Sequence, residues 1–152
     1  MIVCAIGHIE QLGCDIEILR ENFDTDELIH HVLCPAEITT YHSLPDIQRQ
    51  LFFFKLWTAK EAYTKALGQG LLIPMESLHV VNVFTDGELH IIHSKQHPNS
   101  AHHQPHWFLR LFTPTPHSIL ALAASITPTV TFFQAALDHR QGDFPVEVVQ
   151  VN

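Results

Sequence analysis

Two short acidic motifs contain the residues of this chain best suited to chemistry. The first, G-C-D-I-E, carries Asp15 and Glu17, and the second, W-T-A-K-E-A-Y-T-K, carries Glu61 and Lys65. If the first motif is extended, alternation along a strand sends Asp15 and Glu17 to the same face. If the second is helical, the spacing of four places Glu61 beside Lys65. A strand and a helix would then present carboxylates and an ammonium that could hold one hard cation and one phosphate group. Mg²⁺ suits this set, because it prefers oxygen ligands shared between carboxylates and substrate phosphates.

The two motifs together resemble the signature of a known enzyme family. Their order and spacing, followed by the glycine pair Gly68 and Gly70, are similar to those of the 4′-phosphopantetheinyl transferases. These enzymes move the phosphopantetheine arm of coenzyme A onto a serine of an apo acyl or peptidyl carrier protein. The resemblance runs from about Val3 to about Ser125 and includes the intervening segment L-C-P-A-E at 33–37.

The resemblance implies a role for individual residues of this chain. The residues that match the family's Mg²⁺ ligands are Asp15, Glu17 and Glu61. Glu61 also matches the candidate base for the serine hydroxyl, acting directly or through a metal-bound water. Lys65 matches the lysine that contacts coenzyme A phosphates, and a compact ammonium suits that contact. Lys60 either contacts coenzyme A as well or forms surface ion pairs.

Cysteine and histidine offer other chemistries, which the pattern disfavours. The three cysteines, Cys4, Cys14 and Cys34, show no C-x-x-C spacing and are expected to be reduced thiols. Cys14 as a nucleophile is disfavoured, because neighbouring carboxylates oppose formation of its thiolate. The histidine-rich stretch 97–106 contains no cysteine and is interpreted as a polar loop rather than a zinc site.

Composition limits the class of protein. The chain has 152 residues, of which 46% are hydrophobic and 16% charged, as expected for one globular domain with a real core. A net charge of -8 argues against nucleic acid as the main partner. No apolar run approaches the roughly 20 residues of a membrane span, and the start lacks a basic leader, so a cytoplasmic protein is expected. The transferase-like domain is expected over 1–126, with a weakly patterned extension of the same domain over 127–152.

The pattern of apolar and turn residues predicts an α+β fold in which an antiparallel sheet packs on one long helix. This helix is expected over 46–67, with Gly68 as its stop. The Asp86-Gly87 pair is a cue for a hairpin. The other expected elements are strands at 2–6, 13–18, 77–84, 88–92, 107–112, 119–126 and 146–151, and helices from 24 or 25 to 31, at 35–42 and at 132–137.

The long helix carries aromatic residues on the side of its chemical groups. Phe53 and Phe54 fall on the arc that contains Glu61 and Lys65 at about 100° per residue. A solvent-facing arc rarely carries such residues, so we expect something to cover them, as at an interface between subunits. Trp57 is expected to pack and to hold the helix against its neighbours.

The resemblance is to the C-terminal half of the two-half transferases, the type that activates surfactin synthetase. The holo-acyl-carrier-protein synthases, by contrast, have one half per chain and form trimers. This chain has the length of the single-half type, but the Trp57 motif and the A-L-A-A ending at 121–124 are those of the longer type. The half that supplies much of the coenzyme A pocket would precede Met1.

This mixed resemblance predicts a homo-oligomer, with a dimer mimicking the two halves, or a truncated product with impaired turnover. The alternative from another class is a half-enzyme that acts only as a coenzyme A or carrier-protein binding module. A histidine-rich metal-storage domain is a further and disfavoured alternative.

Overall fold

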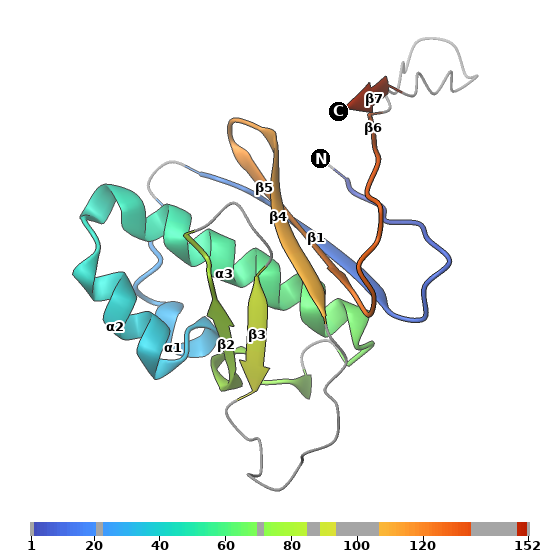
Figure 1. The fold of residues 1–152 in the computed structure, drawn as a ribbon. Coiled ribbons are helices and arrows are strands. Elements are labelled where there is room, and N and C mark those ends of the chain that lie inside the picture. The colour runs from blue at the N-terminus through green and yellow to red at the C-terminus, as the bar shows by residue number, and fades with distance from the viewer. Residues whose placement is uncertain are drawn as a thin grey trace, which may run out of the picture.

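A long helix lying on a three-stranded sheet forms the centre of the molecule. The computed structural model describes residues 2–20, 23–69, 72–84, 89–93, 107–134 and 149–151. The antiparallel sheet has the order β1 (Leu12–Ile18), β5 (Ser118–Ala124), β4 (Phe108–Thr115), and α3 (Asp46–Ala66) packs against all three strands (Figure 1). The expected α+β architecture, an antiparallel sheet on one long helix, is therefore confirmed.

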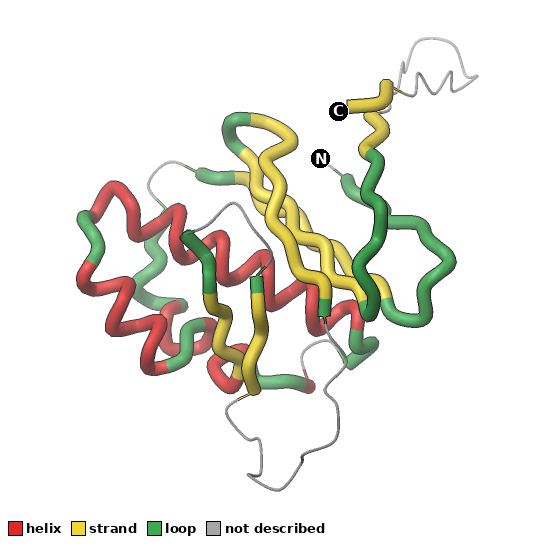
Figure 2. Tube along the Cα trace, in the orientation of Figure 1, coloured by secondary structure: helices red, strands yellow, loops and turns green. Residues whose placement is uncertain are grey.

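Smaller elements pack against α3 beside this sheet (Figure 2). They are α1 (Ile29–Val32), α2 (Pro35–Ser43) and the hairpin of β2 (Leu78–Val81) with β3 (His90–His93). The 3-10 helix η2 (Met75–Ser77) contacts α1. A separate two-stranded sheet pairs β6 (Phe132–Gln134) with β7 (Val149–Val151).

The two faces of the main sheet have different partners because side chains alternate along β1. Gly13 and Asp15 pair with Ala123 and Ala121 of β5, on the face that α3 covers. The opposite face forms a second apolar cluster, whose buried members are Phe108, Leu122 and Ala124, with Leu12, Cys14, Ala5, Ile9, Phe112 and Val130 packed around them. Gly13 and Asp15 of the first motif therefore lie on the strand face that contacts the helix.

Gly13 lets this strand approach the helix backbone. A Cβ placed on Gly13 would lie 2.2 Å from the Ala62 carbonyl oxygen and 2.4 Å from the Ala66 nitrogen. Any other side chain would therefore collide with backbone atoms, which cannot move aside as a flexible side chain can. The close approach brings Asp15, two residues further along β1, next to the last turns of α3.

The C-terminus of α3 is a Schellman motif. Gly68 adopts a φ of 67°, its N–H donates to the Lys65 carbonyl at 3.0 Å, and the Gln69 N–H donates to the Thr64 carbonyl at 3.3 Å. Glycine takes this left-handed conformation without steric cost. The expected stop at Gly68 is confirmed, and the last turn of the helix has its carbonyls satisfied.

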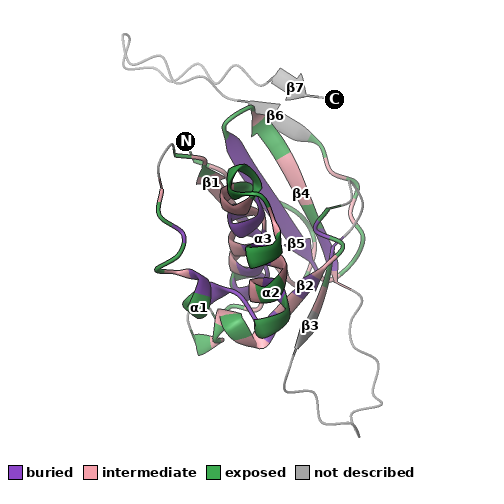
Figure 3. Cartoon of the chain, turned by 90° about the vertical axis from the view of Figure 1, so that its left-hand side faces the viewer, coloured by how far each residue is buried: buried purple, intermediate pink, exposed green. Residues whose placement is uncertain are grey.

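Phe53 and Phe54 are core residues of the chain itself. They are 0% and 3% exposed, and their rings contact Trp57 and Phe23 with centroid separations of 5.4 and 5.2 Å. The expectation that they mark an uncovered interface is therefore wrong. Because α1, α2 and the β2–β3 hairpin cover parts of α3 that the sheet leaves open, the helix is buried on most of its circumference (Figure 3).

Other expectations differ at the ends of the chain. Residues 2–6 are not a strand, and the apolar Ala5 and Ile9 pack on the outer face of the sheet instead. Residues 132–134 are a strand rather than a helix, because they pair with β7. Gly70, the Asp86-Gly87 turn, the stretch 97–106 and residues 135–137 lie outside the described residues. Among the helices that the structure describes, none is long and apolar enough to cross a bilayer.

Candidate active site

Strand β1 and helix α3 bring the two acidic motifs together at Lys65. Its Nζ donates a hydrogen bond to Asp15 Oδ1 at 2.6 Å and lies 3.8 Å from Glu61 Oε2. Asp15 is buried, whereas the Lys65 side chain is 48% exposed. The ammonium thus lies between two carboxylates at the rim of the core, where it is accessible to a ligand.

The second oxygen of Asp15 has no hydrogen-bond donor. Among the described residues it is the one buried side-chain oxygen or nitrogen without a partner. Leaving a buried charged acceptor unsatisfied costs on the order of 1–3 kcal/mol or more. Such an atom in a folded protein calls for an explanation, and an ion is one of the common ones.

The carboxyl groups of Glu17 and Glu61 both have a pKa raised above its ordinary value. Burial raises the pKa of Glu17, and the nearby charges of Asp15 and Glu61 raise it further. Burial raises the pKa of Glu61 as well, with Lys65 lowering it and Asp15 raising it. The three side chains are therefore close enough for their charges to interact. A hard divalent cation would relieve this repulsion, and an all-oxygen donor set fits Mg²⁺.

Lys65 keeps its charge in this environment. Burial by itself would lower the pKa of Lys65, but the hydrogen bond and charge of Asp15, together with the charge of Glu61, raise it above its ordinary value. A fully charged and accessible ammonium is suited to contact a phosphate.

Lys60, the other expected coenzyme A contact, has a different position. It is fully buried, and its Nζ donates to Glu37 Oε2 at 2.5 Å and to the Val32 carbonyl at 2.7 Å. Burial lowers the pKa of Lys60, and the partner Glu37 offsets part of this effect. This placement speaks against both a contact with coenzyme A and a surface ion pair. Lys60 instead anchors α3 to the neighbouring helices.

Glu37 is a structural centre that the motif analysis did not single out. Its carboxylate accepts hydrogen bonds from the N–H groups of Cys34 and Val80, each at 2.8 Å, in addition to the ion pair with Lys60. It therefore links α2, α3 and β2. The available signal was its place in the L-C-P-A-E segment at 33–37, and a buried lysine such as Lys60 requires an acidic partner of this kind.

Cys14 and Trp57 lie where structural roles were expected. Cys14 belongs to the outer cluster of the sheet, on the face opposite Asp15, and burial raises the pKa of its thiol. A reactive thiolate is therefore disfavoured. Trp57 packs against the main core, as expected. All three cysteines are free thiols.

Comparison with known sequences assigns the chain to a family. The sequence model of the 4′-phosphopantetheinyl transferase superfamily matches residues 11–106, and the chain belongs to this family. The chain is 32% identical over 125 residues to the 4′-phosphopantetheinyl transferase HetI of Nostoc sp., a match that covers 82% of this chain and 48% of HetI. It is 30% identical over 79 residues to a 4′-phosphopantetheinyl transferase of Bacillus subtilis, covering 52% of this chain and 34% of that enzyme. The matched part thus spans half or less of these relatives.

Solved structures show the same fold. A holo-(acyl-carrier-protein) synthase of Bacillus anthracis, crystallised in complex with coenzyme A (3′,5′-ADP), has a TM-score of 0.58 at 23% identity, covering 76% of this chain and 94% of that one. The holo-ACP-synthase of Plasmodium yoelii has a TM-score of 0.57 at 22% identity, covering 76% and 93%.

Proposed function

We propose that the protein transfers the 4′-phosphopantetheine arm of coenzyme A to a serine of an apo carrier protein in an Mg²⁺-dependent reaction. The serine oxygen bonds to the β-phosphorus of coenzyme A, the bond between that phosphorus and the bridging oxygen breaks, and 3′,5′-adenosine bisphosphate leaves. The observation that carries the proposal is the buried, unpartnered Oδ2 of Asp15 beside two further interacting carboxylates.

Asp15, Glu17 and Glu61 would hold the ion in this proposal. The cation would supply electrostatic stabilisation of the charge that develops on the pyrophosphate, which is the main service a site can offer phosphoryl-type transfer. Asp15 is fixed for this role by its burial and by its hydrogen bond from Lys65.

Lys65 and Glu61 have the remaining roles. The exposed ammonium of Lys65 contacts a phosphate of coenzyme A. The hydrogen bond from this ammonium to Asp15 fixes its orientation. Glu61 accepts the serine proton or orients a water that does so.

The relatives support the same chemistry. The curated proteins that the chain matches are named 4′-phosphopantetheinyl transferases, and a structural neighbour was crystallised with coenzyme A. We place the reaction in the cytoplasm, in keeping with the free thiols of the chain. We further propose that residues 1–126 form the transferase domain and that 127–152 extend it.

The test is incubation of the purified chain with coenzyme A, Mg²⁺ and a panel of apo carrier proteins from fatty acid, polyketide and peptide synthesis. We expect a mass gain of one phosphopantetheine group on the carrier serine, lost when EDTA replaces Mg²⁺. Binding of coenzyme A or carrier without any mass gain would support the alternative function, a binding module. Neither binding nor transfer would overturn both.

We also propose that two copies of the chain cooperate. The match to HetI covers 48% of that protein, which supports a resemblance to one half of a two-half enzyme. In the main sheet β1 is an edge strand whose last residue, Ile18, is 45% exposed, and Ile2 and Ile6 are 94% and 91% exposed. A second copy could cover these apolar side chains.

A further inference from the structure

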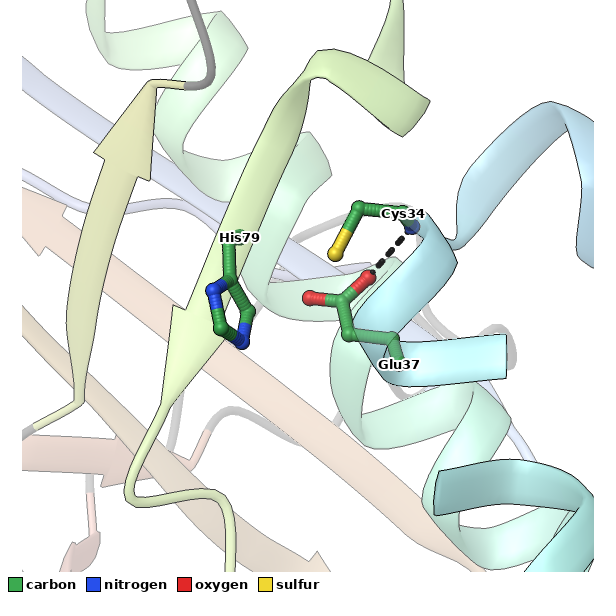
Figure 4. Close-up of side chains that lie close together, drawn as sticks. All are labelled: Cys34, Glu37 and His79. Atoms are coloured by element: carbon green, nitrogen blue, oxygen red, sulfur yellow. Dashed lines mark hydrogen bonds between the residues drawn. The ribbon is translucent and has the colours of Figure 1, made fainter. Parts of the chain in front are cut away.

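A second group of potential metal ligands lies apart from the acidic site, between α2 and β2. It consists of Cys34, Glu37 and His79, and one ligand atom from each lies within 4.8 Å of the others. Figure 4 shows the thiol and the carboxylate on the first turn of α2, facing the imidazole on β2. No part of the proposed transfer reaction uses these three groups as ligands.

The carboxylate of Glu37 is rigidly held and still has an acceptor position open. A carboxylate offers about four lone-pair positions. Oε2 accepts from the Cys34 N–H and from Lys60 Nζ, whereas Oε1 accepts from the Val80 N–H. Three positions are therefore used by these bonds. One position on Oε1 remains for a further partner. Lys60 pairs with the other oxygen, Oε2. Fixed ligand orientation of this kind is what supporting hydrogen bonds provide in metal sites.

Cys34 and His79 supply softer donors on either side of this oxygen. Cys34 is the N-cap of α2, with its sulfur accepting from the Glu37 N–H, so its side chain is directed toward the first turn. The thiol is buried, whereas His79 is only partly buried and leaves a route from solvent. Sulfur, nitrogen and oxygen in one group are donors that suit Zn²⁺ and similar ions rather than Mg²⁺.

We propose that Cys34, Glu37 and His79 bind a thiophilic divalent cation of the Zn²⁺ class. Bonds of about 2.0–2.3 Å to a tetrahedral ion place its ligand atoms roughly 3.5 Å apart, so the three side chains must close by about 1 Å. Rotation of the cysteine and histidine side chains can supply that change. Water takes the fourth position on the side of His79.

Binding of the ion changes the charge of the group. The Cys34 thiol gives up its proton to solvent on binding the metal. The thiolate, the Glu37 carboxylate and the Lys60 ammonium together carry one negative charge, so the group with a divalent ion bound has a net charge of about +1. The positive charge of Lys60, which by itself opposes a further cation, stays paired through the second carboxylate oxygen. The bound ion would join the start of α2 to β2 and would act independently of the oxygen-only site at Asp15.

Cobalt binding provides a direct test, because Co²⁺ substitutes for Zn²⁺ and shows a sulfur-to-cobalt charge-transfer band only when a thiolate ligates it. The variant Cys4→Ser/Cys14→Ser retains Cys34 as its single thiol. We expect this variant and the unmodified chain to give the same band at one equivalent of Co²⁺, and Zn²⁺ to abolish it by displacement. The remaining histidines of the chain can bind Co²⁺ without producing this band.

Two further variants assign the ligands. Cys34→Ser should remove the band while leaving the fold intact, because serine is a favoured N-cap residue. His79→Gln should weaken Co²⁺ affinity by at least about tenfold, whereas His117→Gln, at an exposed turn, should leave it unchanged. A band that persists in Cys34→Ser, or no band in Cys4→Ser/Cys14→Ser, would overturn the proposal. The circular dichroism spectrum of each variant confirms that it is folded.

Discussion

At the scale of single residues, the decisive feature is the unequal environment of the two Asp15 oxygens. Oδ1 accepts from Lys65 at 2.6 Å, whereas the buried Oδ2 has no donor. Three interacting carboxylates and one ammonium leave a local excess of negative charge. The proposed metal ligands follow from this excess together with the donor chemistry.

The first prediction concerns the metal ligands. Asp15→Ala and Glu61→Ala should each reduce Mg²⁺-dependent transfer by about a hundredfold or more, because each removes a fixed charge that supports the transition state. The measurement is carrier-protein mass gain over time. Asp46→Ala is the control, since its side chain is 91% exposed and pairs only with Arg49 among the ion pairs described. Near-normal transfer by either variant would contradict the metal assignment.

The second prediction separates position from general charge. Lys65→Ala should weaken coenzyme A binding by about tenfold, because it removes a charge-assisted contact with phosphate. Lys55→Ala, on the same helix but outside the carboxylate site, should change it little. Calorimetric titration at one fixed salt concentration measures both. Equal losses would mean that the net charge of the helix, rather than the position of Lys65, determines affinity.

At the scale of elements, backbone contact and a buried ion pair position α3. The close approach at Gly13 fixes the strand against the helix, and the Lys60–Glu37 pair fixes the helix against α2. Gly13 lies close to Asp15 in the sequence, and Lys60 directly precedes Glu61. They therefore affect the geometry of the site as well as stability.

The third prediction tests the contact at Gly13. Gly13→Ala should lower the free energy of unfolding by about 3 kcal/mol or more, at or beyond the upper end of the usual cost of overpacking, because the new methyl meets backbone atoms. Gly7→Ala is the matched control, since there the nearest atom, at 3.1 Å, belongs to the flexible Ile9 side chain. Urea unfolding measures both variants. Similar stabilities would show that β1 and α3 can separate without cost.

The fourth prediction tests the buried ion pair. Lys60→Met should destabilise the protein by about 3–5 kcal/mol, because it leaves the Glu37 carboxylate buried without its counter-charge. Adding Glu37→Gln to Lys60→Met should recover part of this loss, since the second change removes the unpaired charge. Thermal unfolding of the single and double variants measures the coupling. If the double variant is no more stable than Lys60→Met, the pair does not account for the loss.

At the scale of the whole molecule, the exposed apolar residues lie outside the core that α3 and the sheet enclose. Ile2, Ile6 and Ile18 are exposed, whereas Phe53 and Phe54 are buried. An interface between copies would therefore use the β1 edge and the N-terminal segment rather than the aromatic face of the helix.

The fifth prediction concerns self-association. The chain should sediment as a dimer at micromolar concentration, because pairing would remove exposed isoleucine side chains from water. Ile18→Asp should shift the equilibrium toward monomer and lower transfer activity in parallel. Ile47→Asp is the control, because Ile47 is also exposed but lies on α3 rather than on the β1 edge. A clean monomer with full transfer activity would contradict the proposal.

The sequence by itself predicted the candidate site residues and most of the elements, because local pattern indicates both, but it assigned residues 2–6 and 132–134 wrongly. Alternation predicted that Asp15 and Glu17 share a face, the spacing of four predicted that Glu61 and Lys65 are neighbours, and Gly68 marked the helix end. The structure confirms the proximity of Asp15, Glu61 and Lys65 and the end of α3. Their roles as metal and coenzyme A ligands stay predictions.

Tertiary structure decided what local pattern could not. Helical periodicity placed Phe53 and Phe54 on one side of a helix, but only packing showed that Phe23 and other parts of the chain cover them. The same periodicity could not tell an exposed Lys60 from a buried one, because the partner, Glu37, is 23 residues away in sequence. The cluster of Cys34, Glu37 and His79 likewise exists only because β2 folds back against α2. Long-range contacts of this kind depend on how the elements dock, and a one-dimensional pattern does not encode that docking in any local signal.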